Sequence, residues 1–460
     1  MRNEQYLTLL LFHIGLGVIL AVLPSLSRIY LYPAIAYWLY LIIANSDRDN
    51  QALLAAAYFT GAEVLFRSTG AVPLYEFVKY AVIGFLLIGL LYRGLRRNNS
   101  IYLVYILLLF PAVIIGAYTI EDPAAIRKSI TFNLSGPVAL GIAALYCSGR
   151  KMSAWQTDRV LVMLCLPIAM MCVYLMIFTP SLEDSVTGTS ANFAASGGFG
   201  PNQVSTIMGL GAFLFFVRFS QNQQLNLIKI LDGIFLLLCA FRGLATFSRG
   251  GMLVAAIMIS LFLGTHWFFS VRSRAQLSSA RPLVFLAVGV VVVWAYTSVA
   301  TGGLLDNRYL NKNAAGVVKS DITTGRAQLL DTEIAAFMSE PFWGVGAGVI
   351  KQYRQENFGV NAASHNEVSR LLSEHGSFGI AILLLLLFIP LSRRLQGETN
   401  PYFYAFFFFY FATINHSSMR LAAPAVVYGL CLLHETNPLR GERPEDDDAH
   451  DDALAIDSPA

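Results

Sequence analysis

The chain has 460 residues, of which 56% are hydrophobic and only 13% are charged. Soluble domains carry about 25% charged residues, so this composition excludes an ordinary soluble globular protein. The formal net charge is +3 at pH 7 and the mean hydropathy is +0.57. Apolar runs of roughly 18 residues or more recur along the chain and indicate a polytopic membrane protein.

The spans are predicted to be helical, because the sequence lacks the repeated alternation of polar and apolar residues that is typical of an outer-membrane barrel. Apolar windows indicate about fourteen transmembrane helices. Their predicted cores are residues 6–23, 29–44, 52–66, 71–92, 101–118, 130–147, 160–178, 203–217, 227–247, 252–269, 282–299, 378–391, 402–414 and 422–433. The predicted fold is therefore an all-α polytopic membrane protein with a long, partly helical loop.

Four parts of the chain follow from these spans. Residues 1–300 hold the first eleven spans, 301–376 form the long loop, and 377–436 hold the last three spans. Residues 437–460 are rich in Asp and Glu, and we expect this tail to be disordered and solvated. The five cysteines lie in or beside apolar runs, so we expect neither a disulfide nor a cysteine-based metal site.

Basic residues in the short connections predict the orientation, since such loops stay on the cytoplasmic side. The basic clusters fall on alternate connections: Arg93/Arg96/Arg97, Arg150/Lys151/Arg159, Arg272/Arg274/Arg281 and Arg393/Arg394. Arg127 and Lys128 break this pattern but are outnumbered. Both termini are therefore predicted to be cytoplasmic, and the long loop is predicted to be periplasmic in a bacterial inner membrane.

The long loop contains a predicted amphipathic helix. After Thr323 and Thr324, the residues Ala327, Leu330, Ile334 and Phe337 share one helical face; Pro341 ends this helix and Arg326 lies in its first turn. We expect it to lie on the membrane surface or against the spans. The following Gly344-Val345-Gly346-Ala347-Gly348 superficially suggests a dinucleotide-binding loop, but no strand precedes it, so a tight turn is the prediction.

Ser364 and Glu367 have the spacing of a capping box, which predicts that His365 lies in the first turn of a helix entering the twelfth span. The helix dipole there disfavours imidazolium, so His365 would be a neutral imidazole able to accept a proton near an anionic ligand. The alternative is a surface histidine beside a helix cap.

Several ionisable residues lie within or at the ends of spans. Glu63 and Arg67 are a helical turn apart, as are Glu76 and Lys79, on two helices that a short connection makes antiparallel neighbours. They form either a structural charge cluster that ties the helices together or part of a catalytic site.

Arg242 and Arg249 are two turns apart if one helix continues through Phe247, so both would face the same way. Two guanidinium groups on one face suit a diphosphate, although Arg249 alone could instead extend to the membrane interface. His416 and Arg420 either add to this region or cap a helix end.

These residues resemble the bacterial O-antigen ligase and O-antigen polymerase family. Ser248-Arg249-Gly250-Gly251 opens a span, Arg326 and Leu330 have the R-x3-L spacing, and His365-Asn366-x9-Gly376-x2-Gly379 leads into the next span. Gly200-Pro201-Asn202 before the eighth span also looks like that family. The resemblance is clearest over residues 193–389.

The resemblance implies a metal-independent membrane glycosyltransferase of the GT-C type, without a cofactor. Such an enzyme moves a glycan from undecaprenyl diphosphate to a hydroxyl acceptor, a lipid A-core sugar or a growing polysaccharide, at the periplasmic face. Arg326 and His365 match the family's essential loop residues, and Arg249 matches its span-opening arginine. The span count departs from the twelve that are common in ligases, which leaves the acceptor open.

The residue chemistry is compatible with that reaction. His365 offers a base for the acceptor hydroxyl, and Arg249 and Arg326 offer cations for the departing diphosphate, with inversion of an α-linked donor as the expected outcome. Two rivals remain. A polysaccharide transporter or lipid-linked oligosaccharide flippase would also suit many spans and buried ion pairs. A membrane acyltransferase would use His365 or His416 as base, but its donor is normally cytoplasmic.

Overall fold

The computed structural model describes residues 3–95, 99–179, 181–221, 226–269, 281–319 and 325–436. Some features predicted from the sequence lie outside these residues. They are the basic residues Arg96, Arg97, Arg272 and Arg274, the pair Thr323 and Thr324, and the acidic tail 437–460.

Helices form at all fourteen segments predicted as spans. In the first half of the chain these are α1 (Asn3–Val22), α2 (Leu26–Ala44), α3 (Gln51–Ser68), α4 (Phe77–Arg93), α5 (Ser100–Thr119), α6 (Pro123–Cys147) and α7 (Ala154–Phe178). In the second half they are α9 (Pro201–Gln221), α10 (Leu227–Ala245), α11 (Arg249–Phe269), α12 (Arg281–Ala300), α16 (Glu367–Leu395), α17 (Phe403–His416) and α18 (Ala423–Cys431).

Nine helices in the described part of the chain are long and apolar enough to cross a membrane: α1, α2, α5, α6, α7, α9, α11, α12 and α16. The other five are short (α4, α17, α18) or carry several polar and charged side chains (α3, α10). At about 1.5 Å per residue, the 14-residue α17 is shorter than the ~30 Å hydrocarbon core. The prediction of a multi-pass helical membrane protein is confirmed, whereas the count of about fourteen spans stays a prediction.

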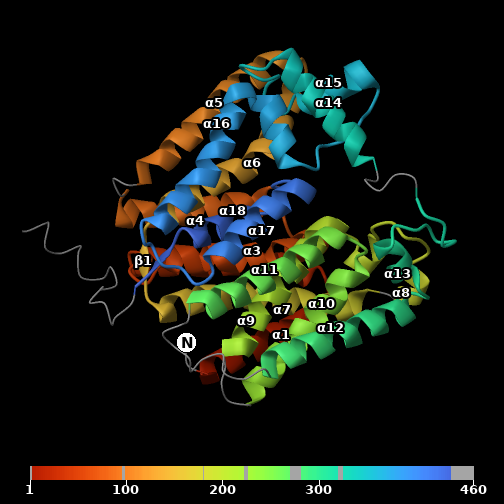
Figure 1. Ribbon diagram of the computed structural model, residues 1–460. Coiled ribbons are helices and arrows are strands. Elements are labelled where there is room, and N and C mark those ends of the chain that lie inside the picture. The colour runs from red at the N-terminus through yellow and green to blue at the C-terminus, as the bar shows by residue number, and fades with distance from the viewer. Residues whose placement is uncertain are drawn as a thin grey trace, which may run out of the picture.

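The helices divide into an inner group and an outer group. In the most apolar stretch of α9, 94% of the residues are buried, against 17% in α12. The inner helix α7 packs against α1 and α3, and α9 packs against α10 and α11. Figure 1 shows α5 and α12 at the periphery, where their apolar side chains face outward as membrane lipid requires.

Short elements lie at one end of the bundle (Figure 1). They are α8 (Leu182–Ser185), the 3₁₀ helix η2 (Ala194–Ser196), α13 (Leu304–Tyr309), α14 (Arg326–Ser339) and α15 (Ile350–Phe358). Toward the opposite end, β1 (Lys151–Met152) pairs in parallel with β2 (His434–Glu435) and joins the start of α7 to the segment after α18. The predicted loop is therefore partly helical.

The predicted loop helix forms as α14, with Arg326 as its first residue and its end before Pro341. Its buried face consists of Thr332, Glu333 and Ala336, which pack toward α16. Leu330 and Ile334, on the face predicted to be apolar, are 39% and 45% exposed. That face is therefore only partly covered by the rest of the protein.

Cysteine labelling tests the predicted orientation. We expect a membrane-impermeant thiol reagent to modify Asn313→Cys, in the exposed segment after α13, from the outside of intact cells. It should leave Asn98→Cys, at a position outside the described residues, unmodified. The five native cysteines are all buried, so background labelling should be low. Labelling of Asn98→Cys with protection of Asn313→Cys would reverse the topology.

Candidate active site

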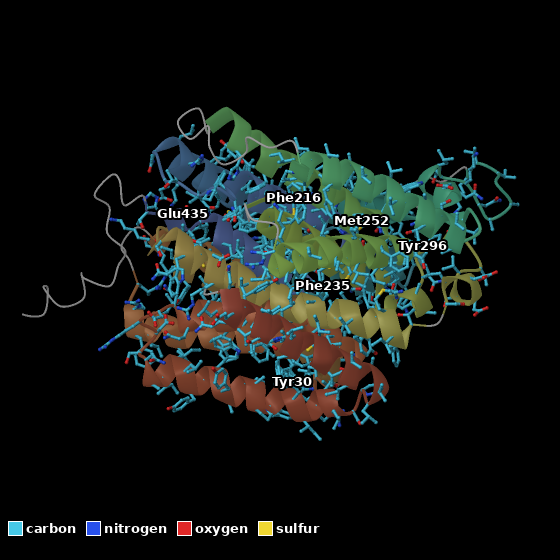
Figure 2. All side chains as sticks on the ribbon, turned by 90° about the horizontal axis from the view of Figure 1, so that it is seen from below. Tyr30, Phe216, Phe235, Met252, Tyr296 and Glu435 are labelled. Carbon is cyan, nitrogen blue, oxygen red and sulfur yellow. The ribbon has the colours of Figure 1, made fainter. Side chains whose placement is uncertain are left out.

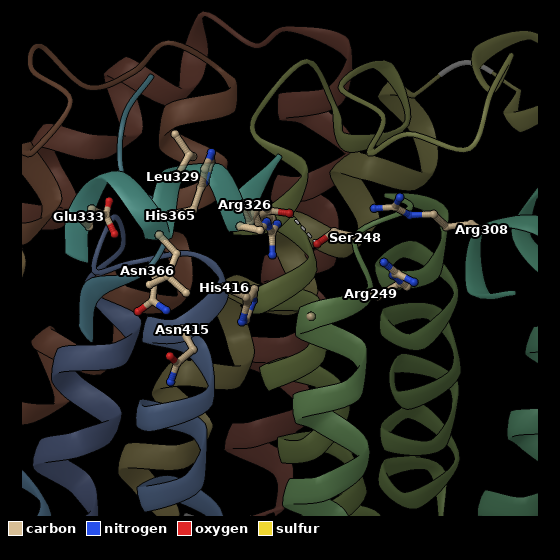
Figure 3. A pocket seen from close by; sticks show the side chains of 14 residues that line it. Ser248, Arg249, Arg308, Arg326, Leu329, Glu333, His365, Asn366, Asn415 and His416 are labelled. Atoms are coloured by element: carbon tan, nitrogen blue, oxygen red, sulfur yellow. Dashed lines mark hydrogen bonds between the residues drawn. The ribbon is translucent and has the colours of Figure 1, made fainter. Parts of the chain in front are cut away.

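A cavity of about 380 Å³ lies where the ends of α9, α11, α14 and α17 meet the segment before α16. Its lining brings together residues far apart in the sequence: Asn202, Ser248, Arg249, Gly250, Arg308, Arg326, Ala327, Leu329, Leu330, Glu333, His365, Asn366, Asn415 and His416. Figure 3 shows Arg249, Arg326 and His416 around the same space, with His365 beside Leu329 on the α14 side. The structure thus places Arg249, Arg326, His365 and Asn366, all predicted as site residues, in one cavity.

Arg249 reaches the cavity because the chain turns sharply before α11. The helix α10 ends at Ala245, and Phe247 has a left-handed φ of 58°. Such a φ is uncommon for a residue other than glycine, and here Arg308 Nε donates a hydrogen bond to the Phe247 carbonyl at 3.0 Å. One helix therefore does not continue through Phe247, so the condition under which Arg242 and Arg249 would face the same way is not met.

Arg242 consequently lies apart from the cavity. It is only 3% exposed, and its Nη2 donates to Thr179 Oγ1 at 2.6 Å and to the Ala195 carbonyl at 2.9 Å. These contacts tie α10 to α7 and η2, so the predicted convergence of Arg242 with Arg249 is not found.

Two glycines let the start of α11 approach its neighbours. A Cβ on Gly250 would lie 2.4 Å from Cδ2 of His416, and one on Gly251 would lie 2.3 Å from the backbone of Ser205. Ser248 Oγ donates to Asn202 Oδ1 at 2.8 Å, which links this turn to α9 (Figure 3). The glycines of the Ser248-Arg249-Gly250-Gly251 motif thus allow the start of α11 to pack closely against its neighbours, and this packing places Arg249 at the cavity.

Three guanidinium groups, those of Arg249, Arg308 and Arg326, line the cavity. Burial, followed by repulsion from Arg249 and Arg326, lowers the pKa of Arg308. Burial and then Arg249 lower the pKa of Arg326. Among the described lining residues, Glu333 carries the one carboxylate, and it is already engaged by Arg354. The cavity therefore carries an excess of positive charge and suits a polyanionic ligand.

His365 lies just outside a helix rather than in its first turn. The N-cap of α16 is Asn366, whose side chain accepts hydrogen bonds from the backbone N–H groups of Val368 and Ser369. The predicted capping box of Ser364 and Glu367 is therefore wrong, since Glu367 forms a buried ion pair with Arg370 instead. Burial, followed by the charges of Arg420, Arg326 and Arg354, lowers the pKa of His365 to about 4. The imidazole is thus neutral at pH 7, as predicted, because of its burial and the nearby cations.

A fully buried arginine fixes the position of His365 relative to Arg326. Arg354, on α15, donates from Nε to Thr332 Oγ1 at 2.8 Å and from Nη2 to Glu333 Oε1 at 2.7 Å, both on α14. It also donates to the carbonyl of Ala362 and lies 3.4 Å from Ser364 Oγ, in the segment that leads to His365. Arg354 therefore joins the helix of one candidate catalytic residue to the segment of the other.

We expect Arg354→Met to lower the free energy of unfolding by about 3–5 kcal/mol, because it leaves Glu333 as an unpaired buried charge. Thermal unfolding of the purified protein measures the change. Adding Glu333→Gln to Arg354→Met should recover most of the loss, whereas equal instability of the single and double variants would contradict the ion-pair explanation.

The glycines of the family motif lie at a kink in α16. Gly376 has φ 56° and ψ −132°, and a Cβ there would lie 2.6 Å from the backbone of Gly344. A Cβ on Gly379 would lie 2.1 Å from the Leu371 carbonyl. Gly344, Gly346 and Gly348 all have positive φ, so the predicted tight turn is confirmed. Backbone N–H groups of this turn bond to the carbonyls of Ser373 and Glu374, which the kink leaves without helical partners.

The charges predicted within the spans form contacts away from the cavity lining. Glu63 and Arg67 are a buried ion pair with a 2.5 Å N–O distance. Glu63 also accepts from the Ala422 N–H, and Arg67 donates to the Arg420 carbonyl. Glu76 immediately precedes α4, while Lys79 is buried and its Nζ has no hydrogen-bond partner among the described residues. The contacts of Glu63 and Arg67 are those of a cluster that ties α3 to the start of α18.

The sequence analysis missed Arg308 and the cavity-lining roles of Asn202 and Asn415. Arg308 lies in a predicted loop without periodicity, and only its charge beside the aromatic Tyr309 signalled it. His416, left open in the sequence, lines the cavity, with Nε2 at 3.4 Å from Thr206 Oγ1. Arg420 donates to the Ser364 carbonyl at 2.8 Å and so holds the residue beside His365.

Comparison with known proteins supports the resemblance seen in the sequence. Residues 234–384 match the family model of O-antigen ligases, a stretch that runs from α10 into α16 and includes Arg249, Arg308, Arg326 and His365. The matched stretch is about a third of the chain, and over this part the chain is similar to O-antigen ligases. A search of curated proteins gives no match.

Proposed function

We propose, on the premise that this multi-pass membrane protein belongs to the O-antigen ligase and polymerase family, that it transfers a glycan from undecaprenyl diphosphate to a hydroxyl acceptor. The family supports a membrane glycosyltransferase-like function. The acceptor class is a lipid A-core sugar or a growing polysaccharide, and the reaction takes place at the periplasmic face of the inner membrane.

The observation that carries this proposal is one cavity lined both by three guanidinium groups and by the neutral imidazole of His365. A diphosphate offers several oxygens, and guanidinium groups bind such oxygens in pairs. Arg249 and Arg326 are proposed to bind the donor diphosphate, and Arg308 adds charge while its Nε holds the turn at Phe247. These residues supply the charge stabilisation that metal ions supply in other transferases, so the proposed mechanism is metal-independent.

In the proposed reaction the acceptor oxygen forms a bond to the anomeric carbon while the bond from that carbon to the diphosphate oxygen breaks. The electron pair leaves with undecaprenyl diphosphate, whose charge the arginines stabilise. The acceptor proton passes to a ring nitrogen of His365. Attack from the face opposite the leaving group inverts the anomeric centre.

Donor binding is proposed to change the basicity of His365. Burial, followed by the charges of Arg420, Arg326 and Arg354, lowers the pKa of His365, and Arg326 is also one of the two arginines proposed to bind the donor. A bound diphosphate compensates the charge of Arg326 and so raises the pKa of His365. His365 is therefore a stronger base in the donor complex than in the free enzyme. Protonation of His365 before the donor binds is correspondingly disfavoured.

Incubation of the purified full-length protein with undecaprenyl-diphosphate oligosaccharide tests the proposal. Lipid A-core and a second lipid-linked oligosaccharide are offered as separate acceptors, and the products are analysed by mass. We expect one acceptor to gain the glycan with release of one undecaprenyl diphosphate per transfer. Movement of intact lipid-linked oligosaccharide across proteoliposomes without any glycosylated product would instead support the flippase.

A further inference from the structure

A second and larger cavity, of about 1230 Å³, lies between α1, α2, α3 and α7 and contains none of the residues of the candidate active site. It is a groove on the outside of the bundle, since α1 and α2 have mostly exposed apolar residues. Tyr30, which lines it, is labelled in Figure 2 on the side of the bundle formed by the first helices. Both helices are long and apolar enough to cross a membrane, so this groove opens toward lipid.

Six aromatic side chains line the groove: Phe12, Tyr30, Tyr37, Trp38, Tyr58 and Trp155. The hydroxyls of Tyr30 and Tyr58 and the ring of His13, which also lines the groove, are hydrogen-bonded to one another. His13 Nε2 lies 2.9 Å from the Tyr58 hydroxyl, which also forms a hydrogen bond with the Tyr30 hydroxyl. The deep part of the groove therefore presents carbon surface to a ligand.

The charged lining residues gather at one end. Glu4 is at the start of α1, Asp49 follows the end of α2, and Arg159 is in the second turn of α7, with its guanidinium carbon 4.7 Å from the centre of the Trp155 ring. Gln5 and Asn45 add amide groups at the same end. The groove thus has a polar mouth with one cation and two carboxylates, and an apolar interior.

The length of the groove distinguishes between possible occupants. Its lining extends from Glu4 to His13 on α1 and from Tyr30 to Asn45 on α2, which correspond to about 14 Å and about 22 Å of helix. Both are shorter than the ~30 Å hydrocarbon core. A transmembrane helix of a second copy would have to cross the full thickness, whereas a lipid enters from one surface only.

We propose that this groove binds one glycerophospholipid with a zwitterionic amine headgroup, such as phosphatidylethanolamine. The phosphate lies at Arg159, the ammonium lies between Glu4 and Asp49, and an acyl chain lies along the aromatic wall. A lipid with a net negative headgroup would bring uncompensated charge close to two carboxylates, so the charges at the mouth favour the zwitterion.

Native mass spectrometry of the purified full-length protein tests the proposal, with phosphatidylethanolamine and phosphatidylglycerol added in separate titrations. We expect one phosphatidylethanolamine to bind with an affinity at least tenfold above that of phosphatidylglycerol and to raise the unfolding temperature. Arg159→Gln should weaken the binding of both lipids, because both carry the phosphate that Arg159 binds. The double variant Glu4→Gln with Asp49→Asn should allow phosphatidylglycerol to bind as well.

A matched pair of substitutions separates the groove from the general lipid annulus. Ala34→Trp fills the groove and should abolish the bound lipid, whereas Ala36→Trp, on the exposed face of the same helix, should leave it in place. Unfolding of both variants without lipid provides the folding control. Equal lipid binding by wild type and Ala34→Trp, equal affinity for the two lipids, or a dimer in place of a lipid-bound monomer would each overturn the proposal.

Discussion

Replacement of His365 by alanine is expected to lower the rate of glycosyl transfer by about 10²–10⁴, the usual contribution of a positioned general base. The reason is that His365 is the neutral imidazole facing the cationic cavity. The rate is measured at saturating donor and acceptor, and donor affinity should change little, because the arginines still bind the diphosphate.

His266→Ala provides a matched control, since His266 lies near the far end of the helix that Arg249 begins. Its rate should remain close to that of wild type. An unchanged rate in His365→Ala would exclude the base, and a loss confined to donor affinity would assign His365 to diphosphate recognition. Thermal unfolding of both variants shows whether the loss comes from misfolding.

The same residue predicts a pH dependence. Since the pKa of His365 is lowered to about 4, kcat/KM should be flat from pH 8 to about pH 5 and fall below that as the free enzyme takes up a proton. In the donor complex the pKa rises, so kcat should begin to fall at a higher pH than kcat/KM. Coincident profiles for the two parameters would contradict the proposed coupling between diphosphate and imidazole.

The low pKa also affects stability. An unfolded chain binds a proton at histidine as the pH falls through about 6.5, while folded His365 stays neutral down to about 4. His365 therefore destabilises the fold progressively between these values, and His365→Ala should lessen the acid sensitivity of unfolding over that window.

Replacement of Arg326 by alanine is expected to lower transfer by about 10²–10³, the usual cost of removing one charge-stabilising donor. Arg326→Lys should recover only part of the rate, because an ammonium group is a single charge and cannot form the paired hydrogen bonds of a guanidinium. Both variants are compared with wild type by initial rates over a range of donor concentrations.

Lys351→Ala is the control for loss of a cation, because Lys351 is exposed on α15 and outside the cavity lining. We expect its rate to be normal. A chelator should also leave the wild-type rate unchanged. Normal turnover of Arg326→Ala, or loss of wild-type activity on chelation, would refute the role of the arginines in stabilising the diphosphate.

The membrane class could be predicted from the sequence because apolar windows identify helices regardless of how these helices pack, and all fourteen predicted segments are helical. Arg249, Arg326 and His365 were singled out by the motif spacing of the family that the sequence resembles and by their position at the end of a span or loop helix. The structure places all three in the lining of one cavity.

The exact ends of the helices were harder to predict. Ser364 and Asn366 are both good N-cap residues, and tertiary contacts decide between them because Arg354 and Arg420 hold Ser364. The break at Phe247 depends on a left-handed residue whose carbonyl is bound by Arg308, 61 positions later. Neither partner carries a local signal. Arg354 was missed for the same reason, since its role depends on two partner segments, α14 and residues 362–364, that the fold brings to it.

The kink at Gly376 explains the spacing between Asn366 and Gly376 in the family motif. The nine residues between Asn366 and Gly376 are the whole first piece of α16, about 14 Å of helix held at one end by the Asn366 cap and at the other by the glycine turn. The length of this piece therefore sets the position and the rotation of the Asn366 cap relative to Gly376. One inserted residue would rotate its capped end by about 100° and carry His365 away from the arginines, so the motif constrains the number of these residues more strictly than their identity.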